Sequence, residues 1–278
     1  KGAVDIARLR FWLSIVVDEE EASPLPNLDY KIMQGNSLIE SYKGLDLSKL
    51  TYAKKSDGHI SQYSIFEDDT KQLQREVTQL LTQYYSCSDH DKKTDLRNKI
   101  SNTIAKQLSV QNFDADILRE LRTLDLAGND QFFLWHTWFS DVFNKGGFDI
   151  VIGNPPYVDY RKIDNITKNG IQKYHTYNIE KKGSLYVYFI EKGLRITKEN
   201  GVLIFINPYQ YLSAESGIGI RDYIIRNHCL ESIIDISNIK VFDTANTYTC
   251  INTFVSNQKQ DDIAIYKPQN LNQIRSNI

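Results

Sequence analysis

The sequence Phe-Asp-Ile-Val-Ile-Gly-Asn-Pro-Pro-Tyr occupies residues 148–157 and decides the fold class that we predict for this chain. Residues 149–152 are mostly β-branched and apolar, which is typical of a strand buried on both faces of a parallel sheet, and Gly153 ends the strand. Asn154 precedes a proline and is therefore restricted to extended backbone, while two successive prolines fix φ and lack N–H donors. We expect a stiff turn at the carboxyl end of a strand, which is where open α/β sheets bind their ligands.

The residues of this turn suit chemistry at an exocyclic amine. Such a nitrogen is a poor nucleophile because its lone pair is delocalised into the adjoining π system. If the Asn154 side-chain oxygen and the Pro155 carbonyl each accept one N–H, the nitrogen becomes more tetrahedral and its lone pair is freed, while Tyr157 offers a face for a planar base. An electrophilic methyl group could then be transferred through positioning and electrostatics, without a strong base. The alternative is that these residues only form a turn, since Asn-Pro is a common turn signal.

The composition is that of an ordinary globular protein, with 278 residues of which 41% are hydrophobic and 24% charged. No apolar run is long enough to span a bilayer and no secretory leader is visible, so we expect a cytoplasmic protein without a membrane anchor. The three cysteines are far apart, which favours neither a disulfide framework nor a metal site. Because the chain begins with Lys1 and its only methionine is Met33, we expect it to be a piece of a longer polypeptide.

The formal net charge of −2 gives no overall signal for nucleic acid. Residues 159–182, which follow the turn, nevertheless contain six basic and three acidic side chains. We expect this basic rim to contact a phosphate backbone, although a solvated surface loop is an equally simple interpretation. The candidate phosphate-binding residues are Arg161, Lys162, Lys168 and Lys173.

The first part of the chain contains a helix and a short strand. Apolar residues at helical spacing predict an amphipathic helix over residues 3–17 that packs on a sheet. A strand is expected at residues 30–34. Gly-Asn-Ser-Leu at residues 35–38 then suits either a site that reads the edge of a nucleotide or a capped turn.

The middle of the chain is predicted to be helical. Two apolar stripes, at residues 73–84 and 96–108, flank a polar stretch and predict a helical hairpin. A further helix rich in aromatic residues is expected over 130–143, capped by Asp130 and ended by the glycines at 146 and 147. His136 within it is most simply a structural residue.

The remaining segments alternate between helices and strands, which predicts a doubly wound α/β sheet. The last two strands have no helix between them and are expected to form an antiparallel hairpin at one edge. The expected helices are 185–195 and 221–227, and the expected strands are 202–206, 232–236 and 248–255. The strand 202–206 ends in a second Asn-Pro pair, at residues 207–208.

On the tetrapeptide 154–157 and on the order of these parts, the chain resembles the DNA adenine-N6 methyltransferases, which use S-adenosylmethionine. It is most similar to the methyltransferase region of type IIG enzymes, which combine restriction and modification in one polypeptide. The resemblance covers residues 1 to about 257. It implies a Rossmann-like methyltransferase sheet with a helical insertion, and sequence-specific methylation of adenine N6 in double-stranded DNA after the base is flipped out.

The resemblance also implies roles for individual residues. The catalytic motif corresponds to Asn154, Pro155, Pro156 and Tyr157. Contact with the cofactor is implied for Asn36, Ser37, Leu38 and Asn154. The aromatic residue that packs against the flipped adenine, besides Tyr157, corresponds to Phe242, with Tyr248 as the second choice.

The glycine-rich cofactor motif of the family and its acidic ribose-binding residue do not precede the helix at 3–17. The sheet is therefore expected to be incomplete at its N-terminal side, and we expect little or no methyl transfer by this chain alone. The expected domains are a partial methyltransferase domain (1–41 and 147–257), a helical insertion (42–146) and a following module or linker (258–278). A target-recognition domain and a fused nuclease are implied partners in the full-length protein.

Two other functions remain open. Glutamine methyltransferases that act on proteins use the same tetrapeptide, but they are compact and lack a long helical insertion. A non-catalytic DNA-binding or scaffolding module would retain the fold without the chemistry. The intact tetrapeptide favours an enzyme.

Overall fold

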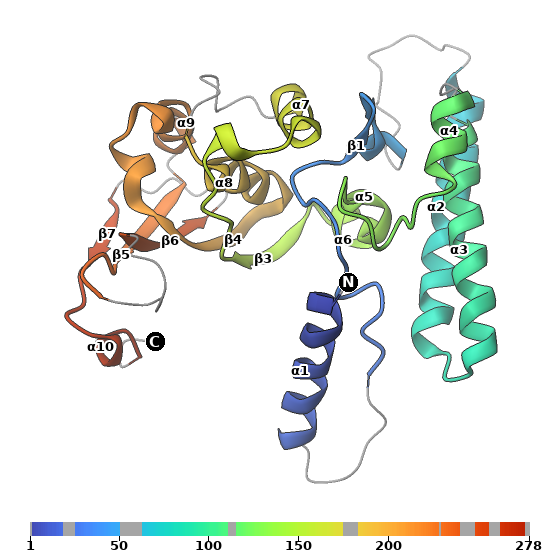
Figure 1. Cartoon of the computed structure of the whole chain (residues 1–278), viewed down its shortest axis with the longest axis horizontal. Coiled ribbons are helices and arrows are strands. Elements are labelled where there is room, and N and C mark those ends of the chain that lie inside the picture. The colour runs from blue at the N-terminus through green and yellow to red at the C-terminus, as the bar shows by residue number, and fades with distance from the viewer. Residues whose placement is uncertain are drawn as a thin grey trace. The chain divides into compact units, whose positions relative to one another are not determined.

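A computed structural model of the chain describes residues 2–18, 26–50, 63–110, 115–174, 183–227, 229–239, 248–255 and 262–275. The chain divides into two compact units, residues 1–141 and 142–278 (Figure 1). The predicted grouping of 1–41 with 147–257 and the predicted insertion 42–146 stay predictions.

The first unit is mainly helical, and the helical hairpin that the sequence predicts is present. Its two helices bury the expected apolar stripes, with Val77, Tyr84, Ile100 and Ile104 each 0% exposed. The elements of this unit are α1 (Gly2–Asp18), β1 (Ser41–Tyr42), β2 (Leu45–Asp46), η1 (Leu47–Leu50), α2 (Tyr63–Ser86), α3 (His90–Val110), α4 (Ala115–Leu121) and α5 (Trp135–Trp138). The strands β1 and β2 pair only with each other, as an antiparallel ribbon.

Helix α1 forms where the sequence predicts it, and the predicted packing of its apolar side chains on a sheet stays a prediction. The four residues that set the helical spacing are each more than half exposed, and they are Ile6, Leu9, Leu13 and Val16. Val17 is exposed on the same face, one turn after Leu13, whereas Phe11 is exposed on the opposite side of the helix, so the apolar side chains are not confined to one narrow stripe. No helix in the described part of the chain is both long and apolar enough to cross a membrane.

The aromatic helix predicted over residues 130–143 is wrong in its extent. It consists of two short helices, α5 and α6 (Ser140–Asn144), and the first begins only at Trp135. Asp130 does not cap it. Asn129 instead accepts hydrogen bonds, through its side-chain oxygen, from the backbone N–H groups two and three residues further on. These hydrogen bonds stabilise a turn before the helix. Asn side chains favour turns because they bond to nearby backbone N–H groups and so offer the backbone an alternative to helical hydrogen bonds.

The second unit contains a five-stranded mixed sheet in the order β3-β4-β6-β5-β7, which confirms the α/β class. Strand β3 pairs in parallel with β4, β6 pairs antiparallel with both β4 and β5, and β7 adds in parallel to β5. The predicted antiparallel pair is therefore present as β5 and β6. It is not at the edge of the sheet, as we expected, because β7 pairs with the other side of β5. The strands are β3 (Phe148–Gly153), β4 (Thr197–Pro208), β5 (Leu230–Asp235), β6 (Thr249–Val255) and β7 (Ala264–Tyr266). Strand β7 adds to this sheet at its edge, and the expectation that residues 258–278 are the start of a following module or linker stays a prediction.

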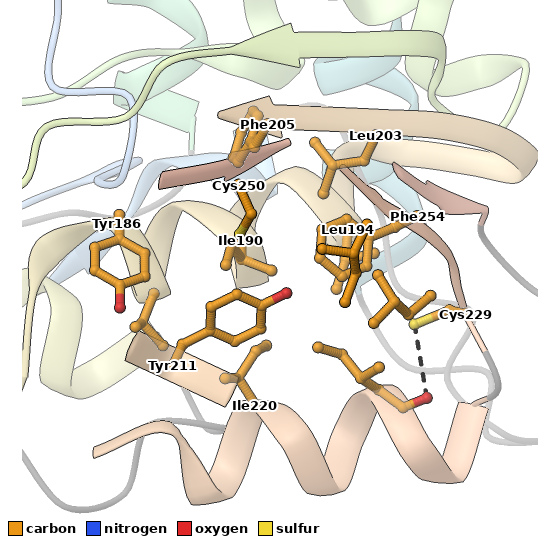
Figure 2. Close-up of a cluster of buried hydrophobic side chains, with 14 residues drawn as sticks. Tyr186, Ile190, Leu194, Leu203, Phe205, Tyr211, Ile220, Cys229, Cys250 and Phe254 are labelled. Atoms are coloured by element: carbon orange, nitrogen blue, oxygen red, sulfur yellow. Dashed lines mark hydrogen bonds between the residues drawn. The ribbon is translucent and has the colours of Figure 1, made fainter. Parts of the chain in front are cut away.

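Helices α8 and α9 cover one face of the sheet (Figure 1). Alternate residues of β4 and β6 point into the core between sheet and helices, and Figure 2 shows Leu203 and Phe205 of β4 facing Ile190 and Leu194 of α8. The helical segments of this unit are η2 (Tyr160–Lys162), α7 (Asn165–Tyr174), α8 (Leu185–Ile196), η3 (Tyr209–Leu212), η4 (Glu215–Gly217), α9 (Ile218–Asn227) and α10 (Leu271–Arg275).

Strand β3 is not buried on both faces, contrary to the prediction from its apolar run. Ile150 is 65% exposed and Ile152 is 76% exposed. Within the described residues of this unit, β3 is an edge strand, and α8 and α9 pack on the other face of the sheet. The apolar run therefore predicted the strand correctly, but it did not predict which of its faces are buried.

Candidate active site

The Asn-Pro-Pro-Tyr loop, residues 154–157, directly follows β3. Asn154 and Pro156 are exposed, Pro155 is buried and Tyr157 is half-buried. Among the described residues, no side chain or backbone group forms a hydrogen bond with the Asn154 amide. Its oxygen therefore remains available to a ligand.

Tyr157 attaches the loop to the neighbouring strand. Its hydroxyl donates a hydrogen bond of 3.1 Å to the Ile206 carbonyl, close to the end of β4. Its ring packs edge-to-face on Tyr186 of α8, with centroids 6.3 Å apart. Burial raises the pKa of Tyr157 to about 12, so the hydroxyl keeps its proton at neutral pH and remains a donor.

The residues on both sides of the loop are held by contacts with neighbouring elements. On the strand side, Gly153 lies against Phe205, and a Cβ atom at residue 153 would be 2.9 Å from the Phe205 ring. On the other side, the Val158 carbonyl accepts the Leu185 N–H at 2.7 Å, and the Tyr160 N–H donates to the Gly183 carbonyl at 2.8 Å. The loop is therefore fixed between the sheet and the start of α8.

The second Asn-Pro pair lies beside the loop, because β3 and β4 are parallel neighbours with Gly153 opposite Phe205. It differs in burial. Asn207 is 0% exposed and its side chain is hydrogen-bonded to Asn252, whereas the side chain of Asn154 is exposed. Pro208 then ends β4.

Two exposed aromatic side chains lie close to each other at the carboxyl end of β4. Tyr209 comes directly after β4, and its ring centroid is 6.0 Å from that of Tyr248, which precedes β6. Tyr248, the second choice for base stacking, is 60% exposed, and Tyr209 is 37% exposed. Tyr209 was not predicted as a site residue, although its position after Asn-Pro repeats the pattern of the loop. Phe242, the first choice, lies outside the described residues.

The basic rim is partly neutralised. Arg161 forms a two-pronged ion pair with Asp159, with contacts of 3.0 and 2.8 Å, and this pair lowers the pKa of the Asp159 carboxyl. Lys162 is exposed, and Lys168 donates to the Arg161 carbonyl at 3.3 Å. The side chain of Lys173 lies outside the described residues. Among the three predicted cations whose side chains are described, Lys162 is thus the best placed to meet a phosphate.

In the first unit, the strand predicted at residues 30–34 is wrong, because most of this segment is a turn. The capped-turn alternative describes residues 35–38 correctly, since the Asn36 side-chain oxygen accepts the Leu38 N–H at 3.3 Å. Asn36 and Ser37 are half-buried, but Leu38 is only 3% exposed. The expected contact of these residues with a cofactor stays a prediction.

Aromatic residues from the segment before and within α5 hold this turn in place. The Trp135 indole N–H donates to the Ser37 carbonyl at 2.9 Å, and Phe133 lies so close to Gly35 that a Cβ atom there would be 2.6 Å from its ring. The buried Glu40 accepts the backbone N–H of His136 and contacts its ring nitrogen, each at 2.8 Å. His136 is therefore structural, as expected.

The structure thus brings together the loop residues, Tyr186 and the end of β4, with the Tyr209 and Tyr248 pair at the same edge. The predicted cofactor residues Asn36, Ser37 and Leu38 belong to the other unit.

Known proteins similar to this chain include a type II restriction enzyme and methyltransferase and several type II methyltransferases. The type II restriction enzyme and methyltransferase RM.Eco57I of Escherichia coli is 29% identical over 43% of this chain and 12% of its own length. The type II methyltransferase M.HincII of Haemophilus influenzae is 28% identical over 52% of this chain and 29% of its own length. The type II methyltransferase M.BstVI of Geobacillus stearothermophilus is 32% identical over 40% of this chain and 19% of its own length.

These alignments span less than a third of each relative. The model of a protein family, the Eco57I restriction-modification methylases, matches residues 1–242, which include both the turn at residues 35–38 and the Asn-Pro-Pro-Tyr loop. Since this match covers well over half of the sequence, the chain belongs to the Eco57I restriction-modification methylase family.

Proposed function

We propose that this chain is part of a DNA methyltransferase that transfers a methyl group from S-adenosylmethionine to N6 of adenine, within a type IIG restriction-modification enzyme. One observation carries the proposal. The Asn154 amide is exposed at the carboxyl end of β3, while the residues on both sides of it are held by the sheet and by α8.

The proposed mechanism uses two acceptors on this loop. The Asn154 side-chain oxygen and the Pro155 carbonyl each accept one N–H of the amino group, which directs the nitrogen lone pair away from the base ring. The prolines restrict the backbone between these acceptors, so little reorganisation is needed when the base arrives. After transfer, the surplus proton on the nitrogen leaves to solvent.

S-adenosylmethionine would supply the electrophilic methyl group. Among the predicted cofactor residues, the half-buried Asn36 and Ser37 carry an amide and a hydroxyl that suit the edge of an adenine ring. The Asn36 side-chain oxygen accepts the Leu38 N–H at 3.3 Å, which fixes the orientation of this amide within the turn.

Duplex DNA as substrate requires that the target base leave the stack, at a cost of a few kcal/mol. Stacking on an aromatic side chain contributes about 1–3 kcal/mol per contact and would offset this cost. The half-buried Tyr157 and the exposed Tyr248 are the described residues that support this role. Lys162 in the basic rim supports contact with the backbone.

The fusion to a nuclease rests on the relatives. The Escherichia coli relative is named as both a restriction enzyme and a methyltransferase, and the aligned part of this chain covers 12% of it. We therefore place a nuclease and a target-recognition domain elsewhere in the full-length protein.

The test is to identify the methylated product. The full-length protein is incubated with S-adenosylmethionine carrying a labelled methyl group, together with genomic DNA lacking adenine methylation or with glutamine-containing peptides. Mass spectrometry of the digested DNA should find N6-methyladenine. Label in the peptides instead would support a glutamine methyltransferase, and absence of label in both would support a non-catalytic module.

A further inference from the structure

Two carboxamide side chains are completely buried beside the Asn-Pro-Pro-Tyr loop. Asn207 of β4 and Asn252 of β6 are both 0% exposed, and they lie on the face of the sheet that α8 and α9 cover. Their neighbours on this face are mostly apolar (Figure 2). A buried amide is costly unless all its polar atoms are hydrogen-bonded, so a site of this kind needs a complete network.

The network is complete. The Asn252 NH2 group donates to the Asn207 side-chain oxygen at 2.9 Å, and the Tyr211 hydroxyl donates to the Asn252 side-chain oxygen at 2.9 Å. The Asn207 NH2 group donates to the Pro208 carbonyl at 2.9 Å. Three segments, the end of β4, β6 and η3, are thereby joined. We call Asn207, Asn252 and Tyr211 the buried amide network.

This network is linked to the loop by two routes. Asn207 directly follows Ile206, whose carbonyl accepts the Tyr157 hydroxyl at 3.1 Å. In addition, Tyr186 packs edge-to-face on Tyr157 at 6.3 Å and on Tyr211 at 6.4 Å, measured between ring centroids. Hydrogen bonds and ring contacts thus connect Tyr211 with Tyr157 along both the strand and the helix.

The network also carries no charge near neutral pH. Burial raises the pKa of Tyr211 well above its ordinary value and that of the neighbouring Cys250 to about 11. The hydroxyl of Tyr211 therefore remains a donor, and its bond to Asn252 persists over the pH range in which enzymes are assayed.

From this geometry we infer that the buried amide network positions the Asn-Pro-Pro-Tyr loop for catalysis. The network fixes the end of β4, the Ile206 carbonyl holds Tyr157, and Tyr157 holds the loop that presents the Asn154 oxygen. Asn207, Asn252 and Tyr211 are positioning residues, because they touch neither the substrate nor the reacting atoms in this arrangement. The inference rests on the proposed function, in which Asn154 binds the amino group that is methylated.

A double-mutant cycle in the full-length protein tests this link. Tyr211→Phe and Tyr157→Phe each remove one hydroxyl and keep the ring. Each should lower kcat for DNA methylation by about 3–10-fold, which corresponds to one net hydrogen bond, while KM for DNA changes less than about twofold. The double variant should be no slower than the slower single variant, because both substitutions break the same linkage. Fold-changes that multiply in the double variant would overturn the inference.

Tyr223→Phe is the matched control. Tyr223 packs against the same core from α9 but is not part of the network. This variant should leave kcat within about twofold of the wild type. If it slowed methylation as much as Tyr211→Phe, general loosening of the core would explain the effect, and the inference would be wrong.

A second measurement does not depend on activity. Hydrogen–deuterium exchange of the backbone amides in residues 153–160 should be faster in Tyr211→Phe than in the wild type and unchanged in Tyr223→Phe. Unchanged exchange in Tyr211→Phe would overturn the link between network and loop. If the wild-type protein methylates neither DNA nor protein but exchange responds as expected, the proposed function fails and the structural link stands.

Discussion

The two Asn-Pro pairs of this protein end neighbouring parallel strands at the same edge of one sheet, yet they have opposite surroundings. Asn154 is exposed, with no hydrogen-bonding partner among the described residues. Asn207 is 0% exposed, and its side-chain amide lies in a saturated network with Asn252 and Tyr211. The same dipeptide thus ends a strand in both places, and burial decides whether its amide serves a ligand or the fold.

The largest expected effect separates these two roles directly. Asn154→Ala removes an acceptor for the reacting amino group and should lower kcat by about 10²–10³-fold, as the loss of one preorganised polar group does in other enzymes. Because the side chain is exposed, the free energy of unfolding should change by less than about 0.5 kcal/mol. Single-turnover methylation and chemical denaturation of the full-length protein measure the two quantities. If Asn154→Ala were as active as the wild type, or if it were unfolded, Asn154 would not differ from Asn207 in serving the reaction and not the fold.

The complementary change is Asn252→Leu, which keeps the approximate size of the side chain but leaves the Asn207 oxygen and the Tyr211 hydroxyl without partners. Unsatisfied buried polar groups cost about 1–3 kcal/mol each, so we expect a loss of about 2–4 kcal/mol in the free energy of unfolding. Urea denaturation checks this value. Asn102→Leu, at an exposed position of α3, is the control and should change stability by less than about 0.5 kcal/mol.

The packing of β3 against β4 can be tested at Gly153. A Cβ atom at this position would lie 2.9 Å from the Phe205 ring, so Gly153→Ala should force β3 and β4 to shift and destabilise the protein by about 1–3 kcal/mol. Activity should fall with stability, since the loop begins at the next residue. Gly2→Ala, where nothing lies within 4 Å, is the control. Equal stability of the two variants would show that Phe205 moves away at little cost.

The smallest effect concerns the basic rim. Lys162→Gln removes an exposed cation and should reduce the dependence of log Kd for DNA on log salt by about one unit of slope. Arg161→Gln should have a smaller effect, because its guanidinium is already paired with Asp159. Titrations with DNA at several salt concentrations compare them. The ranking is wrong if Arg161→Gln changes the slope more than Lys162→Gln does.

The sequence predicts the elements of this fold better than their surroundings. The strand at β3, the turn after it and the helices α8 and α9 follow from local patterns of apolar residues and prolines. The exposure of Ile150 and Ile152 does not, because apolar runs look alike in central and edge strands, and only the sheet order distinguishes them. The strand expected at 30–34 failed for a related reason, since the turn there is closed on the Leu28 carbonyl and its Tyr30 ring packs on Tyr84 and Trp138, which are distant in the sequence.

The candidate site shows the same limit. Asn154 and Tyr157 were predicted from a contiguous motif. Asn252 could not be predicted, because its partners Asn207 and Tyr211 are about forty residues away in the sequence and meet it only through the antiparallel pairing of β4 and β6. Tyr209 had a local signal, because it follows the second Asn-Pro pair as Tyr157 follows the first.

The backbone bonds that join Val158 to Leu185 and Tyr160 to Gly183 have a consequence for protein engineering. They close the base of the segment between residues 160 and 183, so exposed positions of that segment can change without moving the residues that precede it, whereas the buried Ile163 and Ile171 must be kept. Lengthening a loop whose ends are already tied costs little entropy. New peptide sequences that read other DNA bases could therefore be inserted there, leaving the Asn154 end of the sheet as it is.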